Sequence, residues 1–142
     1  MKTIGGKFFS ALCLAGIFLT IPFYRMIEAQ SPTDWAAPVK EKKVKNPIPN
    51  NKESRSRGQI IYMGKCAICH GFKGDGRGEM SKSLDTPPGA FTDRHMMKEM
   101  TDGELFWKIT TGKGPMPSYQ KELTNIERWD LVNFIRSLAK TE

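Results

Sequence analysis

The chain has 142 residues, enough for one domain with extensions, and its 22 basic and 15 acidic side chains give a formal net charge of +7. Its three cysteines are too few for a disulfide framework. The positive charge does not by itself indicate nucleic-acid binding, because the lysines do not alternate with aromatic residues. No stretch alternates in the way a β-strand does and no repeat is present, so the sequence predicts an all-α fold.

Residues 1–29 are predicted to be a signal peptide or a membrane anchor. Two lysines precede residues 8–24, which are uncharged and mostly apolar. This run is near the lower limit for crossing a bilayer, and Ala29 at a candidate cleavage point favours a signal peptide. Cys13 follows a large residue, which fits a lipid-modification signal poorly, although lipidation stays an alternative. In each case the residues that follow are expected on the exported side of the membrane.

Residues 30–53 contain four prolines and the charged run 40–45, and they predict an extended linker. A flexible spacer is the favoured interpretation. The alternative is an arm that docks on a partner protein or lies near the membrane surface, with Trp35 as its anchor. Residues 54–142 are predicted to form the folded domain.

A short helix is predicted over residues 54–65, and Gly58 within it would let another helix approach closely. This helix leads into Cys66-Ala67-Ile68-Cys69-His70, the attachment signature of a c-type haem. Each thiol can form a thioether with one vinyl group of the porphyrin. The histidine that follows can then bind the iron as its proximal axial ligand.

Two other interpretations of these cysteines are weaker. A redox dithiol needs no adjacent histidine and usually occurs in a βαβ unit, of which the sequence shows no sign. A structural zinc site needs four ligands, and with Cys13 in the apolar run only His95 remains to complete one. Covalent haem is therefore the favoured interpretation.

A glycine-rich segment, residues 71–78, follows the motif and predicts a tight loop with positive φ values along the haem edge. It lacks the ending of a phosphate-binding loop and the oxygen ligands of a calcium loop. Residues 79–93 are expected to continue without regular structure.

Two further helices are predicted to begin at capping boxes. Residues 101–104 open a helix that ends at Gly112, with Leu105 and Ile109 facing the core. Residues 124–127 open a C-terminal helix with a wide apolar face, suited to packing across the helix before the motif. The apolar residues of this last helix are Ile126, Trp129, Leu131, Val132, Phe134, Ile135 and Leu138.

The motif supplies one axial ligand, His70, and the strongest candidate for the second is Met116. Pro115 and Pro117 restrict the backbone around it and predict a stiff, extended loop between two helices. Methionine and histidine together keep the iron six-coordinate and raise its reduction potential, which suits electron transfer. His95 is the alternative ligand and would give a bis-histidine haem. Met96, Met97 and Met100 also compete for the iron, although a packing role is the more usual one for them, and Met80 is likewise expected to pack.

In these features the chain resembles the class I c-type cytochromes over roughly residues 55–138. Several strings are also similar to those of the monohaem cytochrome subunits of alternative complex III, the quinol:cytochrome c oxidoreductase. The strings are Asn46-Pro47, residues 70–76, residues 102–109, Pro115-Met116-Pro117 and residues 128–136.

The resemblance implies a small helical bundle around one covalent haem c. It implies thioether bonds at Cys66 and Cys69, with His70 as the proximal and Met116 as the distal iron ligand. The first and last helices of the bundle would cross near Gly58, Tyr62 and the face formed by Trp129 and Phe134.

Together these features predict a monohaem cytochrome that transfers single electrons on the periplasmic side of the cytoplasmic membrane and is not itself an enzyme. Its expected partners are another cytochrome, a quinol-oxidising complex or a terminal oxidase. The protein would act either as a free carrier or as a subunit of a respiratory complex. No nucleic acid is expected, and membrane association would come through the complex or the N-terminal segment. Surface lysines would steer it to an acidic partner, among them Lys65, Lys73, Lys113 and Lys121. The alternative function is a haem enzyme or small-molecule sensor with an open distal site, which requires that Met116 does not bind the iron.

Overall fold

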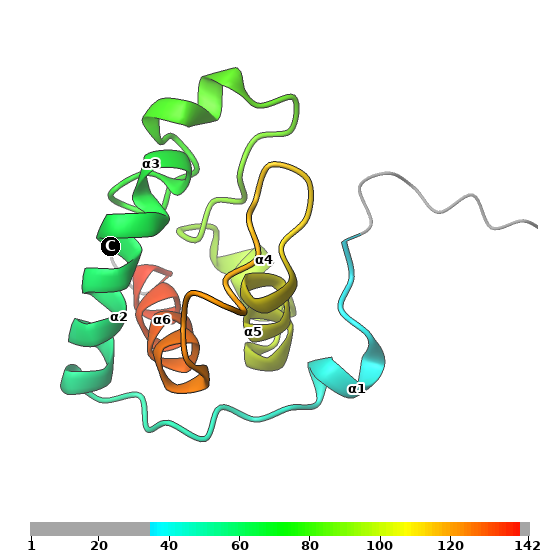
Figure 1. Cartoon of the computed structure of the whole chain (residues 1–142), viewed down its shortest axis with the longest axis vertical. Helices are drawn as coiled ribbons and strands as arrows, with labels where there is room; N and C mark the ends of the chain where they lie inside the picture. Colours follow the sequence, from blue (N-terminus) through cyan, green and yellow to red (C-terminus); the bar gives the residue numbers. More distant parts are fainter. Residues whose placement is uncertain (1–34, 140–142) are drawn as a thin grey trace, which may run out of the picture. The chain divides into compact units, whose positions relative to one another are not determined.

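The computed structural model describes residues 35–139, and the candidate signal peptide or anchor, with Cys13, lies outside them. The elements are α1 (Val39–Lys42), α2 (Lys52–Lys65), α3 (Ala67–His70), the 3-10 helix η1 (Glu79–Ser83), α4 (Arg94–Glu99), α5 (Asp102–Thr111) and α6 (Asn125–Leu138) (Figure 1). Across this described part there is no strand, only an isolated bridge between Lys113 and Met116, so the predicted all-α fold is confirmed. η1 is a short helix where the sequence predicted irregular structure. No helix among these residues is long and apolar enough to span a membrane.

α2 and α6 pack closely because α2 has a glycine where they meet (Figure 1). A Cβ atom on Gly58 would lie 2.1 Å from the carbonyl oxygen of Asp130 and 2.9 Å from Cβ of Phe134, so only glycine fits. One helical turn later, the fully buried Tyr62 packs its ring on Phe134, with 5.1 Å between centroids. The predicted crossing is confirmed at Gly58, Tyr62 and Phe134, whereas Trp129, expected on the same face, stacks on Phe106 of α5.

The same contact contains a buried polar network. Asp130 of α6 accepts hydrogen bonds from Ser54 Oγ at 2.6 Å and from Arg57 Nε at 2.6 Å, both on α2. The hydrogen bond with Asp130 raises the pKa of Arg57. Asn133 donates to Ser54 Oγ at 2.8 Å. Because Ser54, Asp130 and Asn133 are partnered within this network, it favours one relative placement of the two helices.

Residues 35–51, here called the arm, make specific contacts with the helices, which a flexible spacer would not make. Asn46 Nδ2 donates to Asn133 Oδ1 at 2.8 Å, and Asn133 Nδ2 lies 3.2 Å from the carbonyl oxygen of Ile48 and 3.3 Å from that of Pro49. α6 therefore holds the arm through one asparagine that also contacts α2. The boundary of the domain near residue 53 stays a prediction.

The arm also packs on α5. A Cβ atom on Gly103 would lie 2.0 Å from the carbonyl oxygen of Glu41, so this glycine admits the backbone of α1. At the start of the arm, the ring centroids of Trp35 and Trp107 lie 6.4 Å apart, and Lys108 Nζ lies 5.5 Å from the Trp35 ring centroid. Trp35 thus anchors the arm to its own domain.

The two predicted capping boxes differ. At α6 the box is complete: Thr124 Oγ1 accepts from the Glu127 N–H, and Glu127 Oε2 accepts from the Thr124 N–H at 2.8 Å. At α5 only the first half forms, with Thr101 Oγ1 accepting from the Glu104 N–H at 3.2 Å. The Glu104 carboxylate is instead buried and pairs with Lys108 at 3.0 Å. The prediction of a box at α5 was therefore half wrong.

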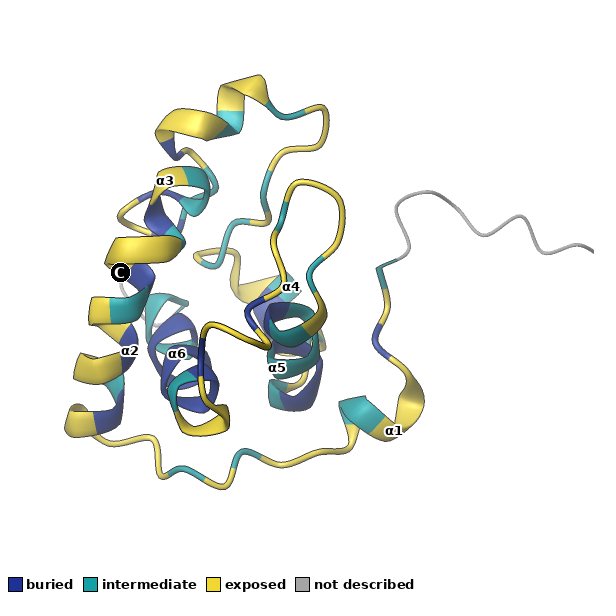
Figure 2. Ribbon diagram, in the orientation of Figure 1, coloured by how far each residue is buried: buried dark blue, intermediate teal, exposed yellow. Residues whose placement is uncertain are grey.

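The apolar face of α6 faces the core as predicted, with one exception (Figure 2). Trp129, whose ring stacks on Phe106 at 4.0 Å between centroids, and Leu131 are buried, as are Leu105 and Ile109 of α5. Ile126, in the first turn of α6, is 58% exposed and does not belong to that face.

Candidate haem site

One turn of helix brings three of the four predicted site residues together. α2 ends at Lys65 with Cys66 as its cap, and α3 begins at Ala67. The N–H of Cys69 and that of His70 both donate to the Cys66 carbonyl, at 3.1 and 2.8 Å. Residues spaced i, i+3 and i+4 share one face of a helical turn, so both sulfurs and the imidazole project from the same side. Ala67 is buried and Ile68 is half-exposed, away from that face.

The imidazole of His70 is held by a backbone carbonyl and by an aromatic ring. Nδ1 lies 3.3 Å from the carbonyl oxygen of Gly89, and the Phe91 ring stacks on the imidazole at 4.6 Å between centroids and 19° between planes. A proton on Nδ1 is donated to Gly89, which leaves the lone pair of Nε2 free for a metal. Burial lowers the pKa of His70 by more than the hydrogen bond with Gly89 raises it. The lowered pKa favours the neutral imidazole, which is the form that binds a metal.

The glycine-rich loop fixes the end of this turn. Gly71 and Gly76 have φ values of 81° and 75°, as predicted for a tight loop. Tyr62 Oη donates to the Gly71 carbonyl at 2.8 Å, so a core residue of α2 also holds the residue after His70. The N–H of Gly78 donates to the Cys69 carbonyl at 3.1 Å, which closes the loop back on the motif.

The chemistry of the two thiols fits a covalent haem better than a reactive dithiol. Both cysteines are free and partly buried. Burial raises the pKa of the Cys66 thiol to about 12, whereas catalytic dithiols lower the pKa of their attacking cysteine. Among residues 35–139 no group of three or more His, Cys, Asp or Glu side chains is placed to hold a metal ion.

Met116 lies on a separate loop, which is anchored beside the motif. The N–H of Lys113 and that of Met116 each donate to the other residue's carbonyl, at 3.0 and 3.1 Å, and Met116 packs against the core. Tyr119 Oη donates to the Lys65 carbonyl at 3.2 Å, one residue before Cys66. The competing ligand His95 is exposed on α4.

Lys65 also binds Glu122, with Nζ 2.9 Å from the carboxylate. Two contacts therefore tie the segment after Met116 to the end of α2. Of the lysines predicted to steer an acidic partner, Lys65 is thus already paired within the chain, whereas Lys73, Lys113 and Lys121 are exposed.

These donors fit a haem c: two free thiols for its vinyl groups, an imidazole with a free nitrogen, and a thioether on a nearby loop. Three supporting residues were missed by sequence reasoning: Phe91, which stacks on His70, and the hydroxyl groups of Tyr62 and Tyr119. Both tyrosines sit at apolar helix or loop positions, where the pattern shows burial but not what the hydroxyl group binds.

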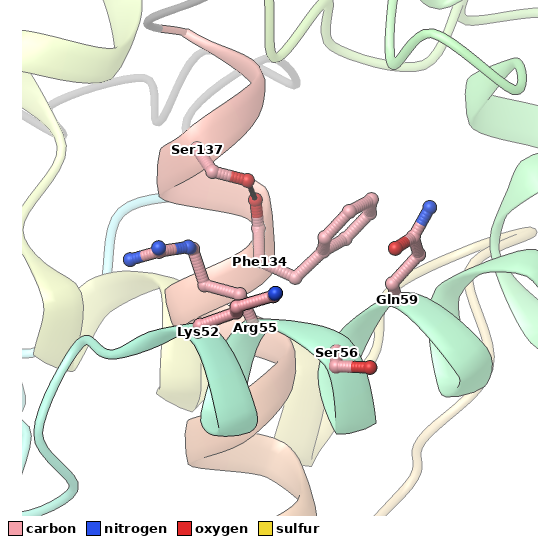
Figure 3. Close-up of a pocket in the computed structure, with 6 residues that line it drawn as sticks. All are labelled: Lys52, Arg55, Ser56, Gln59, Phe134 and Ser137. Carbon is pink, nitrogen blue, oxygen red and sulfur yellow. Dashed lines mark hydrogen bonds between the residues drawn. The ribbon is translucent and has the colours of Figure 1, made fainter.

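A hollow of about 260 Å³ between α2 and α6 lies apart from this site (Figure 3). No residue of α3 or of the Met116 loop lines it. Its walls are Lys52, Arg55, Ser56, Gln59, Phe134 and Ser137, and Ser137 Oγ is already bound to the Phe134 carbonyl.

The fold and the site define a c-type cytochrome, a class of electron-transfer domain that carries covalently bound haem c. Residues 53–135 match the family described as cytochrome c oxidase, cbb3-type, subunit III, and the chain belongs to this family. Among solved structures, a chain of the reducing HAO-like protein complex of Kuenenia stuttgartiensis is similar, with 29% sequence identity and a TM-score of 0.58. That match covers 67% of this chain and 49% of the other, so this chain spans about half the length of its structural relative. No curated protein matches the chain.

Proposed function

We propose that this cytochrome carries one haem c and transfers single electrons on the periplasmic side of the cytoplasmic membrane. In this proposal Cys66 and Cys69 form the two thioether bonds, His70 is the proximal iron ligand, and Met116 is the distal ligand. The family supports covalent haem and electron transfer; the number of haems, the distal ligand and the compartment are the proposal's own.

One observation carries the proposal. The single turn from Cys66 to His70 presents two thiols and an imidazole on one face, and the Gly89 carbonyl leaves Nε2 of that imidazole free. A dithiol enzyme would need neither the histidine nor its orientation by a carbonyl.

The haem, when bound, supplies an iron that changes its charge by one electron, and the protein's part is to keep its surroundings still. Gly89 and Phe91 hold the His70 ring at one angle. Pro115 and Pro117 limit the backbone around Met116, and Tyr119 ties the segment that follows to the end of α2. Ligands held this way move little when the charge changes, which suits electron transfer more than catalysis at an open site.

The chain would act either as a carrier or as a subunit of a membrane respiratory complex. The strings shared with the alternative complex III subunits support a quinol-oxidising complex. The structural relative from Kuenenia stuttgartiensis is likewise part of a protein complex. Co-purification after mild solubilisation separates the two cases: a subunit stays with its complex at high salt, and a carrier does not.

The proposal is tested by intact mass, an optical spectrum and carbon monoxide binding on the native protein. A mass increase of one haem and a ferrous spectrum unchanged by carbon monoxide at neutral pH are expected. A second haem would contradict the monohaem proposal. Ready binding of carbon monoxide would instead indicate an open distal site, as in a haem enzyme or sensor.

A further inference from the structure

A second hollow, of about 340 Å³, lies between the arm, α4, α5 and the end of α6. None of its lining residues belongs to α3 or to the Met116 loop, so it is separate from the haem site. The lining residues that matter here are Lys42, Val44 and Lys45 of the arm, Met97 and Lys98 of α4, Met100 directly after α4, Asp102 of α5 and Arg136 of α6.

The carboxylate in this hollow is already paired. Asp102 Oδ1 accepts from Arg136 Nε at 2.6 Å, and the same guanidinium donates to the carbonyl groups of Met97 and Met100. Arg136 therefore serves the fold and closes one wall. It leaves no unpaired negative charge in the lining.

The lysines of the hollow are not matched in the same way. Lys42 shares the Glu104 carboxylate with Lys108, at 3.5 and 3.0 Å from Nζ. Lys45 and Lys98 form no ion pair with any residue in the described range 35–139. The hollow thus keeps a positive charge that nothing in this part of the chain neutralises.

Apolar side chains line the hollow beside these lysines. Met97 is only 2% exposed, Met100 packs against the core, and Val44 is exposed. Cationic and apolar side chains in one hollow suit a ligand that joins an anionic group to hydrocarbon. A free inorganic anion would use only the lysines.

We propose that this hollow is a docking site for anionic phospholipid headgroups, which would hold this face of the domain on a membrane. The chain's connectivity favours a lipid over an acidic protein. Ten residues, 25–34, separate the apolar run 8–24 from Trp35, and this span of eleven positions reaches at most about 40 Å. From Trp35 the arm runs directly to Lys42 and Lys45. In the case where the apolar run is retained as an anchor, the bilayer that holds it lies within reach of the hollow.

The test uses the intact ferrous haem protein with methyl-labelled methionine and two short-chain lipids below their micelle concentration. Phosphatidylglycerol is expected to shift the methyl resonances of Met97 and Met100 in a saturable way. Phosphatidylcholine and inorganic phosphate are expected to shift them much less. Because monomeric lipids are used, the result does not depend on whether residues 1–29 are retained.

Paired variants give the control. Lys45→Gln with Lys98→Gln should weaken phosphatidylglycerol binding on the order of tenfold, since each lysine contributes a few-fold. Lys73→Gln with Lys82→Gln changes the net charge equally on exposed sites outside the hollow and should leave binding unchanged. Unchanged haem spectra verify the fold of both. The proposal is overturned if phosphatidylglycerol gives no saturable shift, if inorganic phosphate shifts the methyl groups equally, or if the two double variants behave alike.

Discussion

The contact between α2 and α6 gives the sharpest quantitative prediction, through the substitution Gly58→Ala. The added Cβ would lie 2.1 Å from the Asp130 carbonyl oxygen, about 1 Å inside the closest comfortable carbon–oxygen contact. Both groups belong to helix backbones, so the helices must separate. Separation loosens the Tyr62–Phe134 packing and stretches the 2.6 Å hydrogen bond from Ser54 to Asp130.

Overpacking of this kind costs about 1–3 kcal/mol, and a weakened hydrogen bond to a carboxylate adds about 1.5 kcal/mol or more. Alanine returns up to about 1 kcal/mol through its better helix propensity. We therefore expect a net loss of about 2–3 kcal/mol. For a domain of this size that loss lowers the melting temperature by roughly 10–20 °C.

The matched control is Gly64→Ala, in the same helix, where nothing lies within 4 Å of the added Cβ. It should keep or slightly raise the melting temperature, because only the propensity changes. Far-UV circular dichroism of the haem-loaded protein measures both variants. If Gly58→Ala melts within a few degrees of Gly64→Ala, the close crossing and the reasoning from it are wrong.

Three further predictions concern the haem site, the arm and the α6 cap. Met116→Ala should abolish the weak thioether-to-iron charge-transfer band at the red end of the ferric spectrum. The control Met63→Ala, on the surface of α2, should keep this band. A band that survives Met116→Ala would exclude Met116 as the iron ligand. Asn133→Ala removes the side chain that binds the arm to α2 and α6. It should lower the free energy of unfolding by about 1–3 kcal/mol and make residues 43–50 more sensitive to limited proteolysis. Unchanged cleavage would count against that role of Asn133. Hydrogen bonds from Thr124 lower the pKa of Glu127, so its charge stabilises the fold above the ordinary carboxyl pKa and ceases to do so as pH falls through the lowered value. The melting-temperature advantage of the wild type over Glu127→Gln should accordingly vanish in acid, and an advantage that persists there would contradict the assignment.

Local sequence patterns were sufficient for the three longest helices, α2, α5 and α6, and they identify the haem motif as the candidate site. The attachment signature is contiguous, and caps such as Thr124 with Glu127 lie three residues apart, so one short window contains the whole interaction. Gly58 likewise suggested a close approach through its lack of a side chain, and the wide apolar face of the C-terminal helix already indicated the partner.

The arm could not be predicted in this way. Its prolines and lysines are typical of a spacer, yet Asn46 binds Asn133, 87 positions further along the chain. A pattern read along the chain carries no information on such a partner. The half-formed cap at α5 has the same cause, because Lys42 of the arm and Lys108 attract the Glu104 carboxylate that would have closed it.

The polar residues of α6 show how far the amphipathic pattern can mislead. Asp130 and Asn133 are 0% and 2% exposed, whereas the apolar Ile126 is 58% exposed. A buried carboxylate costs several kcal/mol unless it is paired, and here Ser54 and Arg57 pair it from α2. Apolar side chains at these positions could bury as much surface, but they would not select one register between the helices. α2 ends at Lys65, directly before Cys66. The register that Asp130 selects therefore also sets where the haem motif stands relative to the rest of the domain, so a polar part of the core influences the site.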